Sequence, residues 1–143
     1  MIRAPSQRFP RKARLKRRRL IKPLFDRGLS TSQSVSSGCI RLVYRCVPRS
    51  ATGTDSWIQV GFAPGRHKHS VTRNRLRRRM REAWRTHLHL LSSDTIAGDT
   101  TLTVMVLYRV RGFHRNMQHD LVQAMQRLTH HLKEARGEAW IET

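Results

Sequence analysis

The chain has 143 residues, enough for one domain with a single modest hydrophobic core. It carries 29 lysine and arginine residues against 9 acidic residues, which gives a formal net charge of +20 at pH 7. An excess of this size opposes compaction by self-repulsion, and its clustering in residues 11–22 and 73–85 favours a polyanionic partner over a merely solvated face. Because no apolar run reaches about 18 residues, no membrane-spanning helix is expected, and nucleic acid is the favoured polyanion.

The first 13 residues are basic, contain Pro5 and Pro10, and are predicted to form a flexible tail. No charged segment followed by an apolar one marks a secretory signal, and a transit or nuclear signal is the alternative interpretation of the basic tail. Cys39 and Cys46 lie an odd number of positions apart in one apolar run, so on a strand they face opposite sides and cannot pair. Free thiols in a reducing cytosol are the expected state.

The first half of the chain is predicted to hold a short helix and two strands. Apolar residues between positions 15 and 25 predict an amphipathic helix that ends at Gly28, with Pro23 delaying or kinking its start. The Ser/Thr-rich segment that follows is expected to be a loop. Strands are predicted over residues 40–47 and 57–63, joined by a hairpin connection.

A basic loop over residues 64–69, in which a short extra strand is an alternative, leads into a strongly basic helix. That helix is expected to be capped by Ser70 or Thr72 and to end near Leu91, with an apolar stripe at helical spacing. Residues 101–110 are rich in β-branched side chains and are apolar on both faces, which predicts a central strand.

A final amphipathic helix is predicted from about Asn116 to Arg136, and Gly137 is expected to end it. The order of elements is helix, two or three strands, helix, strand, helix. This order indicates a single α+β domain over residues 14–137, in which a sheet of about four strands is packed by helices. Residues 138–143 are expected to be a C-terminal tail.

The second predicted helix carries arginine where packing does not require it. At about 100° per residue, Arg73, Arg77 and Arg81 form a row along one flank of the apolar stripe. Like charges at this spacing repel by roughly 0.2–0.5 kcal/mol per pair. Glu82, four residues after Arg78, is the acidic residue expected to offset this repulsion. Such a row matches phosphates along an RNA groove, which would neutralise it, whereas a merely soluble helix would use a mixture of lysine and glutamate.

Residues 73–82 read R-N-R-L-R-R-R-M-R-E, which resembles the RNR signature of the bacterial ribonuclease P protein family, roughly R-N-R-x-K/R-R-x-x-R-E. The segment Val60-Gly61-Phe62 resembles the family's strand before that helix. Arg14-Leu15, a basic run and Phe25 resemble its first helix, so the resemblance covers roughly residues 14–135. The sequence departs from the pattern in the loop after the strand, which is about one residue short, and at Ile21, where the family has an aromatic residue.

The resemblance implies a ribonuclease P protein-like fold, similar to the second domain of ribosomal protein S5, with a left-handed βαβ crossover around the RNR helix. It also implies the protein subunit of an endoribonuclease holoenzyme that removes the 5′ leader of precursor tRNA. In this family catalysis belongs to the RNA, which holds Mg²⁺ at the scissile phosphate, and the protein binds no cofactor. The implied partners are the catalytic RNA, with one protein per RNA, and precursor tRNA; the implied location is the bacterial cytoplasm, without a membrane partner.

The resemblance also suggests two sites: the RNR helix for the catalytic RNA, and a cleft between the first helix and the sheet for the leader. Phe25 and Tyr44 lie near basic residues and would stack on unpaired bases, with core packing as the alternative. Tyr44 is assigned to the cleft, and Phe25 is left open between the two. The RNR-helix candidates are Arg73, Asn74, Arg75, Arg77, Arg78, Arg81 and Arg85. The leader-cleft candidates are Arg14, Lys16, Ile21, Phe25, Arg41, Tyr44 and Arg45, and the basic-loop candidates are Arg66, His67 and Lys68.

The sequence offers few groups for nuclease chemistry by the protein itself. A two-metal nuclease needs several converging carboxylates, whereas the 9 acidic residues are scattered, mostly in predicted loops or at the chain end. No cysteine and histidine spacing resembles a zinc site, so neither catalytic nor metal-binding residues are predicted. An autonomous nuclease is therefore disfavoured. A ribosomal-type RNA-binding protein or a general RNA chaperone is the alternative, since it would share the charge and the fold class.

Overall fold

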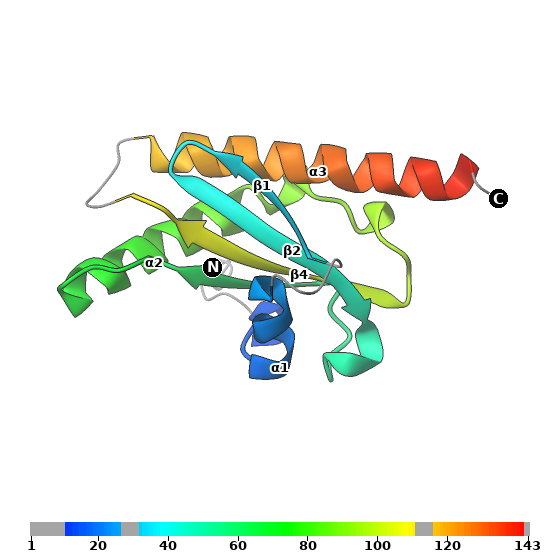
Figure 1. Ribbon diagram of the computed structural model, residues 1–143, viewed down its shortest axis with the longest axis horizontal. Helices are drawn as coiled ribbons and strands as arrows, with labels where there is room; N and C mark the ends of the chain where they lie inside the picture. Colours follow the sequence, from blue (N-terminus) through cyan, green and yellow to red (C-terminus); the bar gives the residue numbers. More distant parts are fainter. Residues whose placement is uncertain (1–10, 27–31, 111–115, 142–143) are drawn as a thin grey trace, which may run out of the picture.

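A mixed sheet of four strands organises the chain, and the computed structural model describes residues 11–26, 32–110 and 116–141, with side chains described as far as residue 135. The strand order is β1-β2-β4-β3, with β4 antiparallel to β2 and parallel to β3 (Figure 1). The predicted central strand is confirmed, because β4 is apolar on both faces and lies between two partners. The strands are β1 (Gln33–Ser37), β2 (Ile40–Pro48), β3 (Ile58–Ala63) and β4 (Thr100–Tyr108).

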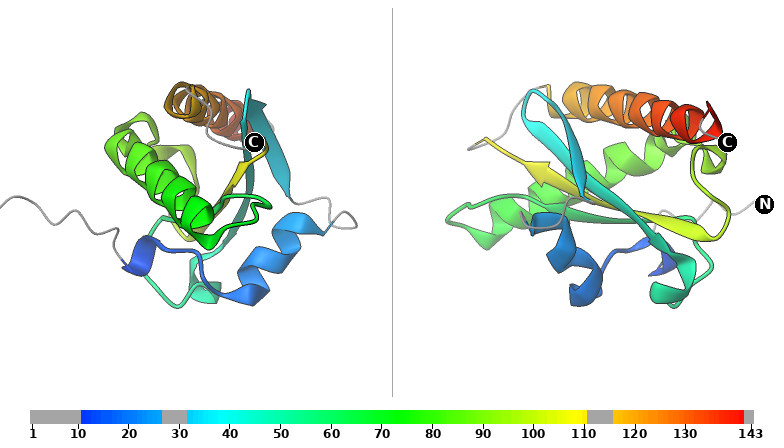
Figure 2. Two further views of the ribbon diagram at one scale, coloured as in Figure 1. Left: turned by 90° about the vertical axis from the view of Figure 1, so that its left-hand side faces the viewer. Right: turned by 45° about the vertical axis from the view of Figure 1, so that its right-hand side comes forward.

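Two long helices, α2 (Ser70–Thr86) and α3 (Met117–Ile141), pack side by side on one face of the sheet (Figure 2). The predicted stripe of α2 is buried there, with Trp84 at 0% exposure. The stripe of α3 packs against the same core through Leu128, which is also 0% exposed. The α+β architecture is therefore confirmed, and β3, α2 and β4 form a parallel βαβ unit.

The other face of the sheet is partly covered by a short basic helix, α1 (Arg18–Ile21), and the 3₁₀ turn η2 (Lys22–Phe25) that continues it. Leu20 and Leu24 are buried against Val43 and Val47 of β2 in a second apolar cluster. Pro23 stands at the start of the 3₁₀ turn, where its missing N–H leaves no helical bond unmade. Because α1 begins at Arg18 and ends at Ile21, the proline lies after the helix and does not delay or kink its start as predicted. The predicted helix end at Gly28 is wrong, because the helical turns end at Phe25 and Asp26 is already extended.

Strand β1 forms where the sequence predicts a Ser/Thr-rich loop, so that prediction is wrong. Val35 of β1 pairs with Leu42 of β2 and is buried, while the Ser37 hydroxyl donates to Gln123 of α3 at 2.8 Å. Gly38 turns the chain with a φ of +53°, a conformation that favours glycine. A serine-rich strand shows little apolar alternation, so its pairing depends on β2 and α3 rather than on its own pattern.

The ends of α2 also differ from prediction. Neither Ser70 nor Thr72 is the N-cap; His69 holds that position without a side-chain hydrogen bond. The helix ends at Thr86 instead of near Leu91, and a 3₁₀ turn, η4, follows over Leu88–Leu90.

Two further boundaries depart from the pattern. Residues 64–69 form a loop without the extra strand, and the additional strand of the sheet is β1 instead. The last helix continues past Gly137 to Ile141, because a single glycine costs a helix only about 1 kcal/mol relative to alanine.

Candidate nucleic-acid interface

The arginine residues of α2 divide into an exposed set and a half-buried row. Arg75, Arg78 and Arg79 are exposed, opposite the buried stripe of Leu76, Met80 and Trp84. The row predicted at four-residue spacing runs along the flank of the helix, and each of its side chains is half-buried. The row consists of Arg73, Arg77 and Arg81.

A neighbouring segment adds a further guanidinium to this row. Arg14 forms a bridge with Val60 at the edge of β3, and the next backbone N–H, that of Leu15, donates to the Val60 carbonyl at 3.0 Å. Burial, together with the positive charges of Arg14, Arg77 and Arg78, lowers the pKa of Arg81 below its ordinary value. Repulsion among these guanidinium groups favours a bound polyanion, because phosphate groups would remove it.

Two side chains of the row also make hydrogen bonds within the protein. Arg73 donates to the His67 carbonyl at 2.6 Å and so ties the basic loop to the start of α2. Arg77 donates to the side-chain oxygen of Asn74 at 3.2 Å, on the exposed surface. Arg73 is therefore partly a structural residue, whereas Arg77 can turn toward a ligand at little cost to the fold.

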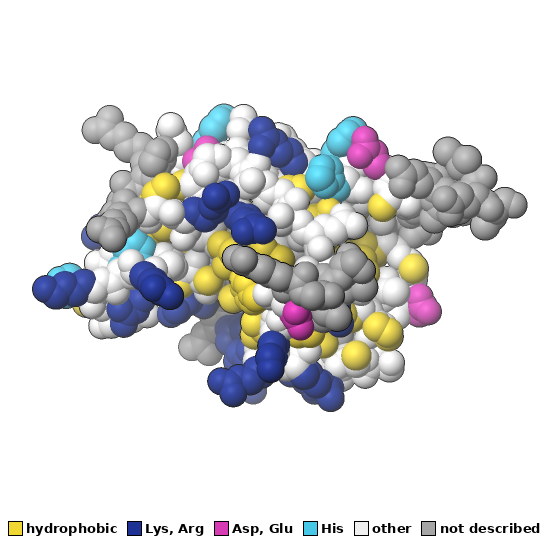
Figure 3. Space-filling view, viewed as in Figure 1, with side chains coloured by type: hydrophobic (Ala, Val, Ile, Leu, Met, Phe, Trp, Pro, Cys, Tyr) yellow, Lys and Arg dark blue, Asp and Glu magenta, His cyan; other side chains and the backbone are white. Residues whose placement is uncertain are grey.

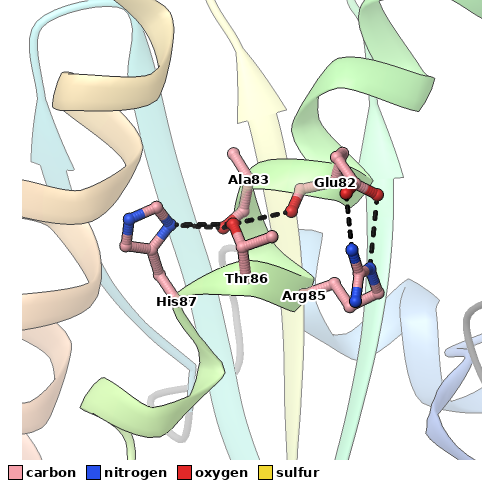
Figure 4. Close-up of polar contacts among 5 residues, drawn as sticks. All are labelled: Glu82, Ala83, Arg85, Thr86 and His87. Carbon is pink, nitrogen blue, oxygen red and sulfur yellow. Dashed lines mark hydrogen bonds and ion pairs between the residues drawn. The ribbon is translucent and has the colours of Figure 1, made fainter. Parts of the chain in front are cut away.

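Glu82 does not relieve Arg78 as the spacing predicts. Its carboxylate pairs with Arg85 at 2.6 Å, one turn toward the C-terminal end of α2 (Figure 4). This hydrogen-bonded pair lowers the pKa of Glu82 and raises that of Arg85. Thr86 donates to the Glu82 carbonyl at 3.0 Å and closes the helix end. The acidic side chain thus neutralises the last turn and leaves the arginine row ahead of it positively charged.

A second surface lies between η2, β1 and β2, on the sheet face opposite α2 and α3. It contains a pocket of about 270 Å³ whose lining includes Phe25, Ser34, Arg41 and Val43. Phe25 is 49% exposed, so the structure places it in the wall of this cleft and not in the core. Figure 3 shows hydrophobic atoms on this face between groups of lysine and arginine side chains. An exposed aromatic ring beside a guanidinium suits stacking on an unpaired base.

Tyr44 lies in the core, and its assignment to the cleft is wrong. Successive residues of a strand face opposite sides, so Tyr44 shares the α3 face with Leu42, while Val43 faces α1. The ring is 5% exposed, and its hydroxyl donates to the Gln33 side chain at 3.0 Å and lies 3.3 Å from His131 Nδ1. Alternation along β2 separates the two faces, but it does not say which one α1 covers.

The other cleft candidates are divided between the two surfaces. Ile21 is half-buried in the apolar cluster beneath α1, and Lys16 is exposed just before that helix. Arg45 is half-buried on the same face of β2 as Arg41. Arg14 forms a bridge with Val60 of β3, and its charge is among the causes that lower the pKa of Arg81 of α2.

In the basic loop, Arg66 and Lys68 are exposed, whereas the His67 ring is held by the protein. His67 Nε2 lies 2.7 Å from the Pro64 carbonyl oxygen, and its ring centroid lies 6.0 Å from that of Tyr108. The structure therefore places two of the three candidates where a ligand can reach them.

Gly61 belongs to the segment over residues 60–62 that resembles the family's strand, and the structure shows a physical reason for a glycine at this position. A Cβ atom at this position would lie 2.7 Å from Met105 Sδ and 3.3 Å from the Leu15 carbonyl oxygen. Glycine therefore allows the N-terminal segment to cross β3 closely. The β1 residues of the cleft, such as Ser34, could not be found from the sequence, because their strand was not predicted.

Within residues 11–26, 32–110 and 116–135, no three histidine, cysteine, aspartate or glutamate side chains are grouped to hold a metal ion. In the same part of the chain no helix is long and apolar enough to cross a membrane. Cys39 is buried, Cys46 is exposed, and both are free thiols. The two surfaces offer guanidinium groups on α2 and an aromatic and basic cleft beside α1.

Comparison with known proteins gives two matches. A family model described as Ribonuclease P matches residues 9–133. Among solved structures, the chain is similar to one described as the RNase P protein from Thermotoga maritima, with a TM-score of 0.50 and 19% sequence identity. That alignment covers 85% of this chain and 96% of the other, and at this identity it shows a shared fold. No curated protein sequence matches the chain.

Proposed function

Because the chain belongs to the ribonuclease P protein family, we propose that it binds the catalytic RNA through α2 and the 5′ leader of precursor tRNA through the cleft beside Phe25. Family membership makes it a protein subunit of an endoribonuclease that processes tRNA and associates with the ribonuclease P RNA. The proposal adds that the two RNAs bind to different surfaces: the catalytic RNA to α2, and the leader of precursor tRNA to the opposite face of the sheet.

The proposal rests on the row of Arg73, Arg77 and Arg81 along the flank of α2, together with Arg14, whose segment is bound to β3 at Val60. Protein charges that repel one another in the free state are neutralised by RNA phosphates, and the released counterions add to the affinity. Arginine is suited to this contact, since its planar fork of donors matches phosphate oxygens.

The cleft is proposed to take single-stranded leader. Phe25 offers a ring face to a base, while Arg41 is close enough to line the same pocket and offers a cation to the backbone. Neither contact depends on base identity, so a leader of varied sequence would be held. Mature tRNA lacks a leader and would gain nothing from this surface.

Cleavage itself is proposed to belong to the RNA, with Mg²⁺ held there and not by protein side chains. The protein would act by holding both RNAs on one rigid sheet, one copy per catalytic RNA, in the cytoplasm. Positioning of this kind lowers the barrier by fixing reactants before the chemical step.

The test is reconstitution of purified chain, ribonuclease P RNA and precursor tRNA at low Mg²⁺. Cleavage at the 5′ end that requires both the RNA and the protein supports the proposal. Cleavage without the RNA would establish a protein nuclease, and a protein with no effect on cleavage would leave a general RNA chaperone.

A variant connects this activity to α2. Arg77→Ala is expected to weaken binding of the catalytic RNA and to lower the slope of log K against log salt by about one unit, the value for one lost phosphate contact. Lys133→Ala, which removes one exposed charge from α3, is the matched control. Equal slopes for the two variants, with folding intact by circular dichroism, would remove α2 from the proposal.

A further inference from the structure

A larger pocket, of about 680 Å³, lies at the end of the sheet where β3 and β4 begin. Its walls come from three separate segments: the N-terminal segment, the connection between β2 and β3, and the loops between α2 and β4. The size falls within the usual range for sites that hold small molecules, about 300–1,000 Å³. Among its lining residues are Lys12, Asp55, Trp57, Leu88, Asp94 and Gly98.

The pocket walls are held in place by hydrogen bonds between these segments. The Trp57 carbonyl accepts from the Leu102 N–H of β4 at 2.8 Å. The Lys12 carbonyl accepts from the Gln59 side chain of β3 at 3.1 Å. The N-terminal segment and the tryptophan backbone are thus fixed to the sheet, and a ligand would meet a preformed site.

The lining combines an aromatic ring, two carboxylates and two cations, of which Arg49 is held to the Thr100 carbonyl of β4 at 2.7 Å. Trp57 is half-buried, packing partly against the core, and Lys12, Asp55 and Asp94 are exposed at the pocket. Two of the chain's 9 acidic residues therefore face this one cavity, in a protein of net charge +20. Carboxylates repel phosphate, but they accept hydrogen bonds from the N–H groups on the edge of a base.

An aromatic ring beside a carboxylate favours one of the four bases over the others. An unpaired base is read by stacking on an aromatic side chain and by hydrogen bonds to its Watson–Crick edge. Guanine presents two adjacent donors on that edge, N1–H and the exocyclic amino group, which match the two oxygens of one carboxylate. Adenine, cytosine and uracil do not present two adjacent donors there.

The pocket is also close along the chain to Arg14. Lys12 lies only two residues before Arg14, whose charge acts on Arg81 of α2. Two residues of extended chain span at most about 7 Å, which is comparable to the rise of one nucleotide. An RNA backbone lying on Arg14 and Arg81 could therefore place a neighbouring base at the pocket mouth.

We propose that this pocket binds one unpaired guanine of the RNA that lies on α2, with Trp57 stacking on the base and Asp55 or Asp94 accepting from its edge. The identity of the RNA rests on the proposed function, whereas the preference for guanine rests on the pocket alone. The site would make binding of the RNA dependent on sequence at one position, which the arginine row cannot do.

The first experiment measures the pocket without RNA. The full chain is titrated with guanosine, adenosine, cytidine and uridine 5′-monophosphates at constant ionic strength, and the Trp57 indole N–H is followed by NMR after assignment with Trp57→Phe. Because the four nucleotides carry the same phosphate, differences among them report on the base. The expected result is a saturable shift with the guanine nucleotide, at least about tenfold tighter than with the other three.

Two variants test the named groups. In Asp55→Asn with Asp94→Asn the guanine preference is expected to vanish, because an amide offers only one acceptor. Gly98→Trp places a large side chain at the wall of the pocket, which Gly98 lines. A Cβ atom there would meet no atom within 4 Å, and the φ of Gly98 is outside the left-handed region, so the loop tolerates a side chain. Gln118→Trp, on the exposed surface near the start of α3, is the control for an added tryptophan.

The second experiment uses the ribonuclease P RNA and kethoxal, which modifies the N1 and amino positions of unpaired guanine. Wild-type protein and Gln118→Trp are expected to protect one guanine that Gly98→Trp leaves reactive, while protections along α2 persist in all three. Equal shifts with all four nucleotides, or none, would overturn the guanine pocket whatever the RNA result. A guanine preference in a chain that binds no ribonuclease P RNA would instead overturn the proposed function and leave the pocket standing.

Discussion

The guanidinium of Arg14 lies close enough to that of Arg81 to lower its pKa, although one residue precedes α1 and the other belongs to α2. The N-terminal segment brings this charge close by docking along the edge of β3, where Arg14 bridges Val60 and the Leu15 N–H donates to the Val60 carbonyl. The protein therefore assembles like charges at the junction of two elements, where they oppose the fold until an anion binds.

Arg81→Met should stabilise the free protein and weaken its binding to the catalytic RNA. Methionine keeps the apolar stem of the half-buried side chain and removes repulsion worth roughly 0.2–0.5 kcal/mol per pair. The measurements are the free energy of unfolding in urea and the RNA affinity at several salt concentrations. Lys133→Met, which removes an exposed charge from α3, should change neither by much. A loss of stability in Arg81→Met would show that the guanidinium has an unrecognised partner.

Phe25→Ala should weaken binding of precursor tRNA by the reconstituted holoenzyme by about 1–3 kcal/mol, the usual value of a stacked base. Because Phe25 is 49% exposed, its removal leaves no cavity in the core. Affinity for mature tRNA should be unchanged, since the stacked base belongs to the leader. Substrate affinities with leaders of graded length provide the measurement, and an equal loss for precursor and mature tRNA would contradict the cleft assignment.

Tyr44→Phe is the complementary change on the opposite face of the sheet. Loss of the hydroxyl removes its hydrogen bond to Gln33 at 3.0 Å and its contact with His131 at 3.3 Å. Unfolding in urea should show a loss of about 0.5–1.5 kcal/mol, the usual contribution of a hydrogen bond. The leader affinity should equal that of the wild type, and a selective loss of leader binding would return Tyr44 to the cleft.

Cys39 should make the stability depend on alkaline pH. Burial, and secondarily Asp120, raises the pKa of Cys39 from 9.0 to about 12. A thiol that holds its proton more tightly when folded stabilises the protein fully below pH 9, and this contribution is lost as the pH rises toward 12. The free energy of unfolding should therefore fall in that interval by up to about 1.4 kcal/mol per pH unit, and less in Cys39→Ala.

The two thiols should also differ in reactivity toward a maleimide at pH 8. Cys46 is exposed and should react in the native protein, whereas Cys39 is buried and should react only after unfolding. Mass spectrometry of the modified peptides distinguishes them. Rapid native modification of Cys39 would show that the turn between β1 and β2 opens readily.

Gly61→Val should loosen the N-terminal segment from β3. Its side chain would meet Met105 Sδ and the Leu15 carbonyl, both within 3.3 Å of the first added carbon. We expect a loss of about 1–3 kcal/mol in stability, as in other overpacked sites, and faster proteolysis near Arg14. Gln118→Val on α3 is the control, and an unchanged protease pattern in Gly61→Val would mean that the crossing is not tight in solution.

Elements with a local residue pattern could be predicted from the sequence. The stripe of Leu76, Met80 and Trp84 predicted the buried face of α2, and the β-branched run predicted the central strand. Strand β1 was missed because its serine residues acquire partners only from β2 and α3. Tyr44 was assigned to the wrong face for a related reason, because tertiary packing, and not the alternation along β2, decides which face α1 covers. The effect of Arg14 on Arg81 could not be predicted, because neither segment has a sequence pattern that indicates the other as its neighbour.

The strand order has a consequence for how the chain folds while it is being synthesised. Strand β3 has β4 as its partner among the described strands, yet β4 is made only after α2. At about 5–20 residues per second, the interval between the end of α2 at Thr86 and the end of β4 at Tyr108 is about one to four seconds. During that time the apolar stripe of α2 has no completed sheet to cover. A chain released after α2 would carry the arginine residues without the surface that orients them, so the last strand to join the sheet completes the binding site.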